Sequence, residues 1–573
     1  MIPYLSILTM LPAVGALVLA LSPEGKAGMT RGIAFLFAGI NLIVALAVLS
    51  QFKAGTFHYQ FTEYAPWVSS LGIAYRIGVD GISLWMVVLT ALLTPLAIAS
   101  TGGVTSRLKT MLALILLLET AMIGAFISLD LILFFTFFEL TLLPMYFIIA
   151  IWGGEHRQRA ANKFLLYTFA GSIFMLVGMA ALAFRYYQTQ GQLSFSVTAI
   201  QQAVAAGGFW TNAIQAQGIA FWAFAIALLV KTPVFPFHTW IGDSYTEAPV
   251  AAPILSSVMV KLGAYGMIRF LLPLFPDAAR ANAPIFAILA MVSILYGAAV
   301  AAVQPNMRRM MAYSTLSHMG FVVLGIFSLT HSGMMGASLG MFAHGVTSAM
   351  MLLLIGHLLQ ARGSTLFRDF GGLKARVPVL TTLFFIALLG SVGLPATNGF
   401  VGEILALLGA FEGGMAGNIP IWAAVASGLG VVLAAAYLLY MYQQTFLGPQ
   451  PVAHEELGDV SELKGHSLFV MAVLVGLIFF GGLQPAAFTK SMELSGQASR
   501  LMATAPPGGK PMWQDYSTEI ATDGSVVRTG ERKLPDLGSP VDGGENLAPA
   551  DLHPGQIPSG GNAGEVALAR SEP

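Results

Sequence analysis

The chain has 573 residues, of which 56% are hydrophobic and only 10% are charged, with a formal net charge of zero and a mean hydropathy of +0.75. A soluble globular protein carries about a quarter of charged residues, so this composition excludes that class and indicates a polytopic membrane protein. The chain has no cysteine, which excludes disulfides, thiolate-bound iron–sulfur clusters and cysteine-based zinc sites within it.

Apolar runs of about 20 residues, the length that spans a bilayer, predict an all-α fold with about fourteen transmembrane helices. The first run has no basic segment before it and a comparable run follows it, so we expect a retained helix and not a cleaved signal. The expected helices are 2–22, 32–50, 80–100, 110–128, 131–151, 160–184, 216–238, 249–272, 282–303, 307–329, 333–360, 378–411, 418–447 and 466–486.

Lysine and arginine are divided unevenly between the loops that this helix count defines. Loops rich in these residues stay on the cytoplasmic side of a membrane. The odd-numbered loops hold Lys26, Arg31, Arg107, Lys109, Arg157, Arg159, Lys163, Arg308, Arg309, Arg362, Arg368, Lys374, Arg376 and Lys464. The even-numbered loops hold only Lys53, Arg76, Arg185 and Arg280. We therefore expect a bacterial inner-membrane protein with both termini on the periplasmic side.

Two of the expected helices are interrupted by proline. Lys231 in the seventh run is followed by Pro233 and Pro236, and the twelfth run contains Pro395 within the segment GLPATNGF. Proline removes a backbone donor and clashes with the preceding turn, so we expect helix breaks at Pro233 and Pro395. Broken helices at membrane depth are tolerated only where they meet protein or a water-filled cavity. Both breaks therefore indicate a polar path inside the bundle.

The two breaks lie five helices apart, and this odd number predicts an inverted repeat. Two successive five-helix units must then have opposite orientations, an arrangement that is typical of secondary transporters. We assign the repeats to helices 4–8 and 9–13. The expected units are 1–108 with the first three helices and an outer loop, 109–272 with the first repeat, 273–447 with the inverted second repeat, 448–486 with the last helix, and 487–573 as a polar, disordered tail.

Two segments outside the helices have a composition of their own. The loop 52–78 is polar and alternates in FHYQF, which predicts a small hairpin on the outer face. Residues 487–573 are rich in Pro, Gly, Asp and Glu. They show no apolar periodicity, so we expect most of this tail to be extended and disordered.

Two charged residues, Glu139 in the fifth helix and Lys231 in the seventh, are predicted to lie in the bilayer. A charged side chain at the bilayer centre costs roughly 2.5 to 3.5 kcal/mol on insertion scales, so such residues indicate a functional site. Burial disfavours the charged form of an isolated group, whereas a neighbouring opposite charge favours it. A Glu139–Lys231 pair is therefore expected, and separating the two groups would release a proton from the lysine. The alternative is a static salt bridge that fixes helix packing.

Four further titratable residues stand in predicted helices 8, 10, 11 and 12. Lys261 shares a helix face with Ser257 and Tyr265, and His318 and His344 each have a serine four residues away. The pKa of histidine, about 6.5, suits a proton relay, although each histidine alone could be a core imidazole that bonds a hydroxyl or a carbonyl. Glu403 follows the second break. With Glu139 and Lys231, these residues predict a proton path. No nucleotide-binding loop, metal-ligand cluster or nucleophile–base pair stands out.

Six motifs resemble the antiporter-like, proton-translocating subunits of respiratory complex I, and most closely the M-type subunits that correspond to mitochondrial subunit 4. The similarity extends from the first helix to about residue 486. The motifs are PFHTW at 236–240, TEAP at 246–249, KLGAYGMIR at 261–269, MAYSTLSHMGF at 311–321, FRDFGGL at 367–373 and LPATNGFVGE at 394–403.

The resemblance implies a fourteen-helix proton-pumping subunit of NADH:quinone oxidoreductase. By position, Glu139 and Lys231 are similar to the paired input residues of that family, and Lys261 is similar to its central lysine. His318 and His344 then correspond to the relay and Glu403 to the exit residue; sister subunits tend to have lysine at this last position. The subunit itself would hold no cofactor. FMN, iron–sulfur clusters and quinone are expected in partner subunits, and further antiporter-like subunits are expected on either side.

Two features depart from the family pattern. After the tryptophan of PFHTW the family usually has Leu-Pro-Asp-Ala-His, whereas this chain has Ile241, Gly242, Asp243, Ser244 and Tyr245. The long polar C-terminal tail is also unlike the usual short ending. Two other functions stay open from the sequence: a sodium/proton antiporter subunit, and the membrane subunit of a hydrogenase complex.

Overall fold

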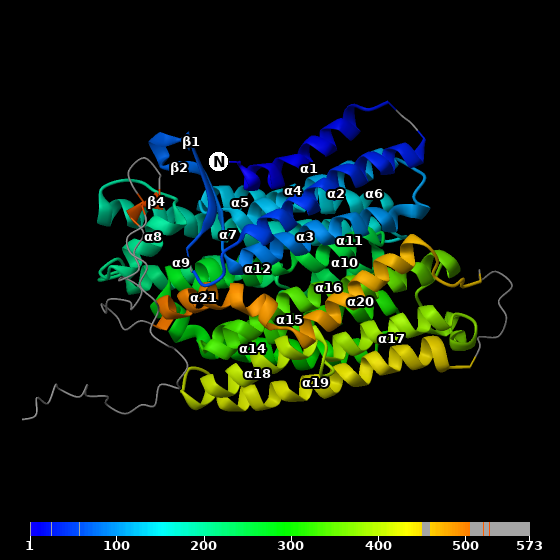
Figure 1. Ribbon diagram of the computed structural model, residues 1–573. Coiled ribbons are helices and arrows are strands. Elements are labelled where there is room, and N and C mark those ends of the chain that lie inside the picture. The colour runs from blue at the N-terminus through cyan, green and yellow to red at the C-terminus, as the bar shows by residue number, and fades with distance from the viewer. Residues whose placement is uncertain are drawn as a thin grey trace, which may run out of the picture.

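The computed structural model describes residues 2–23, 26–56, 58–449 and 459–504, together with the backbone of residues 519–520 and 526–527. In these ranges, 13 helices are long and apolar enough to cross a membrane. They lie side by side in one bundle (Figure 1). The predicted all-α polytopic fold is therefore confirmed.

The N-terminal part consists of three helices and a hairpin. Its elements are α1 (Tyr4–Leu21), α2 (Ala27–Gln51), β1 (Gln60–Val68), the 3₁₀ turn η1 (Ser69–Leu71), β2 (Ile73–Val79), α3 (Gly81–Ala99) and the 3₁₀ turn η2 (Ser100–Gly103). The predicted hairpin is confirmed: β1 pairs with β2 antiparallel, from Gln60 opposite Val79 to Val68 opposite Ile73. The hairpin leads directly into the N-terminus of α3.

The middle of the chain contains the first predicted break. Its elements are α4 (Leu108–Ile127), α5 (Leu131–Leu140), α6 (Leu142–Trp152), α7 (Arg157–Gln190), α8 (Val197–Ala205), α9 (Ile214–Lys231), α10 (Thr239–Glu247), α11 (Ala251–Met259), α12 (Lys261–Gly266), the π-helix η3 (Met267–Leu271) and α13 (Leu272–Leu274). Helices α5 and α6 together form one span, and the segment from α11 to α13 forms another.

The second half contains the second predicted break and a helix beyond the last expected span. Its elements are α14 (Pro276–Ala302), α15 (Met307–Phe327), α16 (His331–Arg362), the 3₁₀ turns η4 (Phe367–Asp369) and η5 (Leu373–Ala375), α17 (Pro378–Val392), α18 (Asn398–Met415), α19 (Ile421–Tyr442), the π-helix η6 (Gln443–Leu447), α20 (His466–Leu483), α21 (Ala486–Thr504) and the two short strands β3 (Glu519–Ile520) and β4 (Val526–Val527).

Both expected broken helices are confirmed. Helix α9 ends at Lys231 and α10 begins only at Thr239, while α17 ends at Val392 and α18 begins at Asn398. The twelfth expected run is thus divided, and its first piece, α17, is the shorter apolar helix of 15 residues that accompanies the 13 long ones. A third interruption was not predicted: Lys261 begins α12, directly after α11 has ended.

Polar side chains start several of the spans. Asp80 forms a capping box with Ser83 at the start of α3, and Asp130, Asn306 and Thr330 accept backbone hydrogen bonds at the starts of α5, α15 and α16. The first amides of a helix have no partner within it, and such caps supply one. These residues therefore help to fix where each helix begins.

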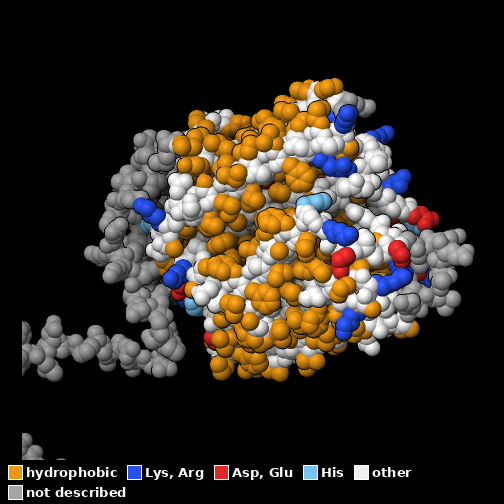
Figure 2. All heavy atoms as spheres, turned by 45° about the vertical axis from the view of Figure 1, so that its right-hand side comes forward, with side chains coloured by type: hydrophobic (Ala, Val, Ile, Leu, Met, Phe, Trp, Pro, Cys, Tyr) orange, Lys and Arg blue, Asp and Glu red, His pale blue; other side chains and the backbone are white. Residues whose placement is uncertain are grey.

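The bundle has a buried centre and a more exposed rim. The apolar windows of Ala251–Leu274 and Met307–Phe327 are 100% and 94% buried, whereas those of Ala27–Gln51 and His466–Leu483 are 28% and 22% buried. Figure 2 shows hydrophobic side chains over the flank of the bundle and Lys and Arg gathered toward one end. Among the buried central helices, α12 carries Lys261, α15 carries His318 and α16 carries His344.

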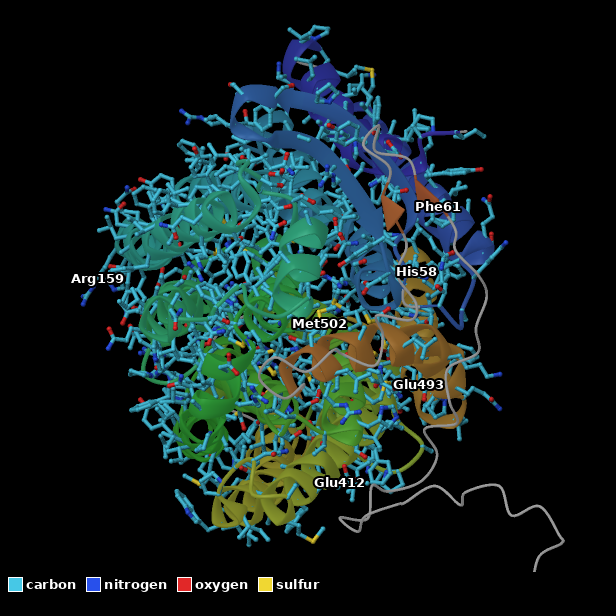
Figure 3. The ribbon with its side chains drawn as sticks, turned by 90° about the vertical axis from the view of Figure 1, so that its left-hand side faces the viewer. His58, Phe61, Arg159, Glu412, Glu493 and Met502 are labelled. Carbon is cyan, nitrogen blue, oxygen red and sulfur yellow. The ribbon has the colours of Figure 1, made fainter. Side chains whose placement is uncertain are left out.

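The prediction that residues 487–573 form a disordered tail is wrong for the first part of this segment. Residues up to Thr504 belong to α21, a helix that packs on the bundle. Its buried face includes Phe488 and Met492, four residues apart. The indole Nε1 of Trp85 donates to Ser491 Oγ at 2.8 Å, and Gly81 N donates to Ser495 Oγ at 3.0 Å. Figure 3 shows α21 across this end of the molecule, with Glu493 and Met502 labelled.

The composition of the whole tail concealed this amphipathic segment, whose apolar face repeats at helical spacing. The rest of the predicted tail lies outside the described residues, apart from β3 and β4, which pair antiparallel.

Candidate proton pathway

Four of the predicted residues form one connected line through the centre of the bundle. Lys261 Nζ in α12 lies 2.7 Å from His344 Nδ1 in α16. His318 Nδ1 in α15 lies 2.7 Å from Glu403 Oε1 in α18. The ring centroids of His318 and His344 lie 5.5 Å apart. Residues from four separate helices therefore meet in the order Lys261, His344, His318 and Glu403.

Each of the two close pairs can share a single mobile proton. An ammonium only donates, and a neutral imidazole has one donor and one acceptor nitrogen. Lys261 therefore donates to His344 when the lysine carries the proton, and accepts from His344 Nδ1 when it does not. His318 and Glu403 stand in the same relation, with the carboxylate as acceptor. The arrangement can pass a proton along without moving a heavy atom far.

A small cavity joins the second pair to the first. It is lined by polar side chains and by glycines of α16 and α18, among them His318, His344, Thr347, Gly340, Gly402 and Glu403. Its volume is about 20 Å³, which is enough for one water molecule. Nε2 of His318 is buried without a protein partner. One water can thus bridge the imidazole and its polar neighbours.

Lys231 lies at the C-terminal end of α9, 1% exposed. Its Nζ donates to Thr141 Oγ1 at 2.7 Å and lies 4.6 Å from the ring centre of Phe138. The lysine is therefore held by the junction between α5 and α6.

The expected direct pair of Glu139 with Lys231 is not formed among the residues that the structure describes. Glu139 acts on Lys231 electrostatically, but its Oε1 is buried without a hydrogen-bond partner. The reason is helix rotation: two residues along a helix turn the side-chain direction by about 200°. The α5–α6 junction therefore turns Thr141 toward the lysine and Glu139 away from it.

The two lysines stand on elements that touch. A Cβ at Gly263, two residues after Lys261, would lie 2.1 Å from Thr232 Oγ1 and 2.4 Å from the carbonyl oxygen of Leu228. Only glycine permits this approach between α12 and the end of α9. The buried hydroxyl of Thr232 has no partner. A polar contact region therefore lies between Lys231 and the helix of Lys261.

A buried ion pair at the outer end of the Lys261 helix was missed by the sequence interpretation. Arg269 in η3 pairs with Asp80, donates to the hydroxyl of Tyr59 at 2.8 Å, and lies 3.3 Å from the hydroxyl of Tyr265. Burial opposes ionisation of Asp80, but the guanidinium of Arg269 outweighs it and holds the pKa of this carboxyl below its usual range. An arginine inside an expected span was the available signal.

Thr141 was also missed, and no sequence signal identifies it among the many threonines of the chain. Within the described part of the chain, no group of three or more His, Cys, Asp or Glu residues could hold a metal ion.

The chain is similar in sequence and in fold to known proteins. The model of the family described as "NADH:quinone oxidoreductase/Mrp antiporter, TM" matches residues 128–433. The chain is 37% identical over 502 residues to NADH-quinone oxidoreductase subunit M of Rickettsia bellii, covering 86% of this chain and 98% of that one. It is 37% identical over 490 residues to subunit M of Rhodobacter capsulatus, with coverages of 85% and 94%.

Among solved structures, a chain of respiratory complex I from Thermus thermophilus with bound NADH superposes with a TM-score of 0.77. It is 29% identical, and the match covers 87% of this chain and all of that one.

Proposed function

Because this chain belongs to the NADH:quinone oxidoreductase/Mrp antiporter family of transmembrane proteins, we propose that it is the M subunit of a bacterial respiratory complex I and translocates protons in its membrane arm. The chain takes no part in electron transfer in this proposal. It is one part of an NADH:quinone oxidoreductase, and it acts as a translocase driven by partner subunits.

The observation that carries the proposal is the line from Lys261 to Glu403. Two hydrogen-bond distances of 2.7 Å, and two tilted imidazoles whose ring centroids are 5.5 Å apart, bring together side chains from four helices. Ionisable residues inside a membrane are costly and mark proton relays. A purely structural role would not require two histidines between a lysine and a glutamate.

Lys231 and Glu139 form the input in this proposal. With its amine on Thr141 and apart from Glu139, Lys231 loses the carboxylate that favours its charged form and tends to release its proton toward Lys261. When Glu139 and Lys231 come together again, Lys231 takes up the next proton. Moving one charge against an assumed force of about 200 mV costs about 4.6 kcal/mol, which corresponds to about 3.4 pKa units. Burial and pairing together supply shifts of that size.

The two breaks occupy matching places in the proposed inverted repeats, helices 4–8 and 9–13. Lys231 ends the helix before the first break, and Glu403 lies in the helix after the second. We assign Lys231 to the cytoplasmic input and Glu403 to the release site, in a bacterial inner membrane with both termini periplasmic.

Partner subunits would supply what this chain lacks. FMN, iron–sulfur clusters and quinone belong to other subunits of the complex, and neighbouring antiporter-like subunits would cover the apolar rim. Exposed apolar side chains occur on α2, α7 and α19, for example Ile43, Leu166 and Val432.

The test is Lys231→Ala in the complete complex. We expect the complex to assemble with its flavin and iron–sulfur arm, and NADH-driven proton pumping into membrane vesicles to be lost. Recovery of the chain with antiporter subunits alone, or undiminished pumping by the variant, would reject the proposal.

A further inference from the structure

The phenol of Tyr245 is a buried polar group that the pathway above does not use. Tyr245 lies in α10, the piece of the seventh helix that follows the break, and is 1% exposed. Its hydroxyl is buried without a hydrogen-bond partner within direct reach. A buried hydroxyl that loses its hydrogen bonds to water costs about 1 to 3 kcal/mol unless they are replaced, so this atom requires a partner.

Two other hydroxyls converge on this position from different helices. Ser256 in α11 and Thr315 in α15 lie next to the phenol oxygen, yet neither forms a direct hydrogen bond to it. Three hydroxyls that meet at more than bonding distance are arranged as a water molecule requires, since a buried water makes about three hydrogen bonds.

A cavity is present at this place. It is lined by Ser244, Tyr245 and Ser256, with Trp240 and Met259 among its apolar walls, and has a volume of about 10 Å³. This is the lower limit for holding one water molecule. The cavity therefore has room for no more than one water, which would lie beside the hydroxyl-bearing Tyr245 and Ser256 within otherwise mostly apolar walls.

The site lies near two residues of the line from Lys261 to Glu403, namely Lys261 and His318. Ser256 and Lys261 are five residues apart, a rise of about 7.5 Å, and Met259 of the cavity wall directly precedes the interruption before Lys261. Thr315 is one turn before His318 on α15. On the other side, Asp243 in α10 forms a pair with Lys163 at 2.8 Å, with the two side chains 30% and 33% exposed. The Asp243 member of this partly exposed charge pair lies two residues before Tyr245 in α10.

We propose that Tyr245, Ser256 and Thr315 bind one ordered water and that this hydroxyl–water site relays protons from the end of α10 at Asp243 toward Lys261. A proton arrives on the phenol oxygen as the phenol passes its own proton to the water, and the water passes one of its protons to Ser256 and onward. Every member gains and loses one proton, so the site ends unchanged after each group reorients. The proposal rests on the proton-translocating function proposed above and adds its entry route.

A tyrosine suits a relay that must not store protons. A phenol has a pKa of about 10 in water and both donates and accepts through one oxygen. It therefore stays neutral at ambient pH, and the storage of charge is left to Lys231 and Lys261. This chain has Tyr245 where the resembling family usually has histidine, so its entry would lack a titratable group at this point.

The test compares Tyr245→Phe with the wild type in the assembled complex. Phenylalanine keeps the ring and its packing but removes the relaying oxygen. We expect NADH-driven pumping to fall roughly tenfold, less than the roughly 100- to 10,000-fold that a positioned proton-transfer group provides in catalysis. We also expect the ordered water to be absent from a high-resolution map of the variant. Tyr186→Phe on α7, a buried ring far along the chain from this cavity, is the matched control and should pump like the wild type.

A double-mutant cycle separates a relay from a packing effect. If Tyr245→Phe and Ser256→Ala act through the same water, their effects should be strongly non-additive, whereas independent packing defects would add. Additive effects, or wild-type pumping by Tyr245→Phe while Lys231→Ala abolishes pumping, would overturn the relay and leave the proposed function standing. Undiminished pumping in Lys231→Ala would instead reject the function itself.

Discussion

The contact between Lys231 and Thr141 shows how a single hydroxyl supports a proton-transfer lysine. A hydroxyl accepts a hydrogen bond from an ammonium and can donate one to a neutral amine, whereas a carboxylate only accepts. Thr141, 2.7 Å from the lysine Nζ, therefore supports Lys231 in both protonation states. Glu139 favours only the charged state. Whether Lys231 contacts Glu139 or only Thr141 therefore determines whether the lysine keeps or releases its proton.

Thr141→Val should therefore slow pumping without preventing assembly. Valine has the shape of threonine but cannot bond the amine, and a hydrogen bond to a charged group is worth about 1.5 to 3 kcal/mol. Lys231 should then turn to Glu139 and stay charged, which reduces the released population by roughly 10- to 100-fold, at 1.4 kcal/mol for each factor of ten. The rate of NADH-driven acidification of membrane vesicles measures the resulting loss of pumping.

Thr136→Val provides the control on the same helix. Thr136 is exposed and bonds only the carbonyl of Ile132, so its replacement should leave pumping unchanged. Equal rates in Thr141→Val and the wild type would show that the hydroxyl does not hold the functional state of Lys231.

At the scale of elements, the contact between α16 and α18 sets the distance between His344 and Glu403. Glycines line this contact: a Cβ on Gly336 would lie 2.2 Å from the backbone nitrogen of Ala406, and one on Gly402 would lie 2.7 Å from Cα of Gly340. The two helices thus touch backbone to backbone directly beside the cavity that His318 and Glu403 line. Close packing of this kind through small residues is a usual way to hold membrane helices together.

Gly336→Ala should force α16 and α18 apart. The clash is with backbone, which cannot rotate away, and overpacking of this kind typically costs about 1 to 3 kcal/mol. We expect a lower temperature of heat-induced aggregation for the purified complex and weaker pumping, because Glu403 on α18 moves away from His344 on α16.

Gly476→Ala on α20 is the matched helical control, since a Cβ there meets nothing within 4 Å. Alanine is favoured over glycine in a helix by roughly 0.5 to 1 kcal/mol, so this variant should be as stable as the wild type or slightly more so. If Gly336→Ala behaves like Gly476→Ala, the tight contact is not needed for stability.

At the scale of the whole molecule, the sequence was sufficient to predict the spans and the two breaks at proline, but not the interruption before Lys261. Hydropathy identifies membrane helices because the bilayer selects length and apolarity, and proline marks both breaks for a steric reason. Thirteen long spans and the divided α17–α18 run correspond to the fourteen expected. The line from Lys261 to Glu403 could be proposed because each residue is costly in a membrane.

What the sequence could not supply were the contacts that depend on helix rotation and docking. The partner of Lys231 is Thr141 and not Glu139, because the α5–α6 junction turns one residue toward α9 and the other away from it. The docking of α21 depends on two serines that receive hydrogen bonds from α3, a pairing that no local pattern encodes. Tyr245 drew attention only as a departure from a family motif, and its role emerged once Ser256 and Thr315 were placed beside it.

The orientation of the molecule can be tested with one helix. Helix α7 has 34 residues, a length of about 51 Å, which exceeds the thickness of a bilayer with its headgroups, about 40 to 45 Å. Arg159 near its start and Gln192 just after its end are both exposed, so they should lie on opposite sides of the membrane. The chain has no native cysteine, so single Arg159→Cys and Gln192→Cys variants carry one reactive thiol each.

A membrane-impermeant maleimide should label Gln192→Cys in intact spheroplasts and Arg159→Cys only in inverted vesicles. This follows because the loops rich in lysine and arginine, including the one with Arg159, remain in the cytoplasm. The reverse labelling would place Glu403 on the route of proton uptake and Lys231 on the route of release. Labelling of both variants from one side would contradict the spanning of α7, and with it the assignment of the two breaks to inverted halves.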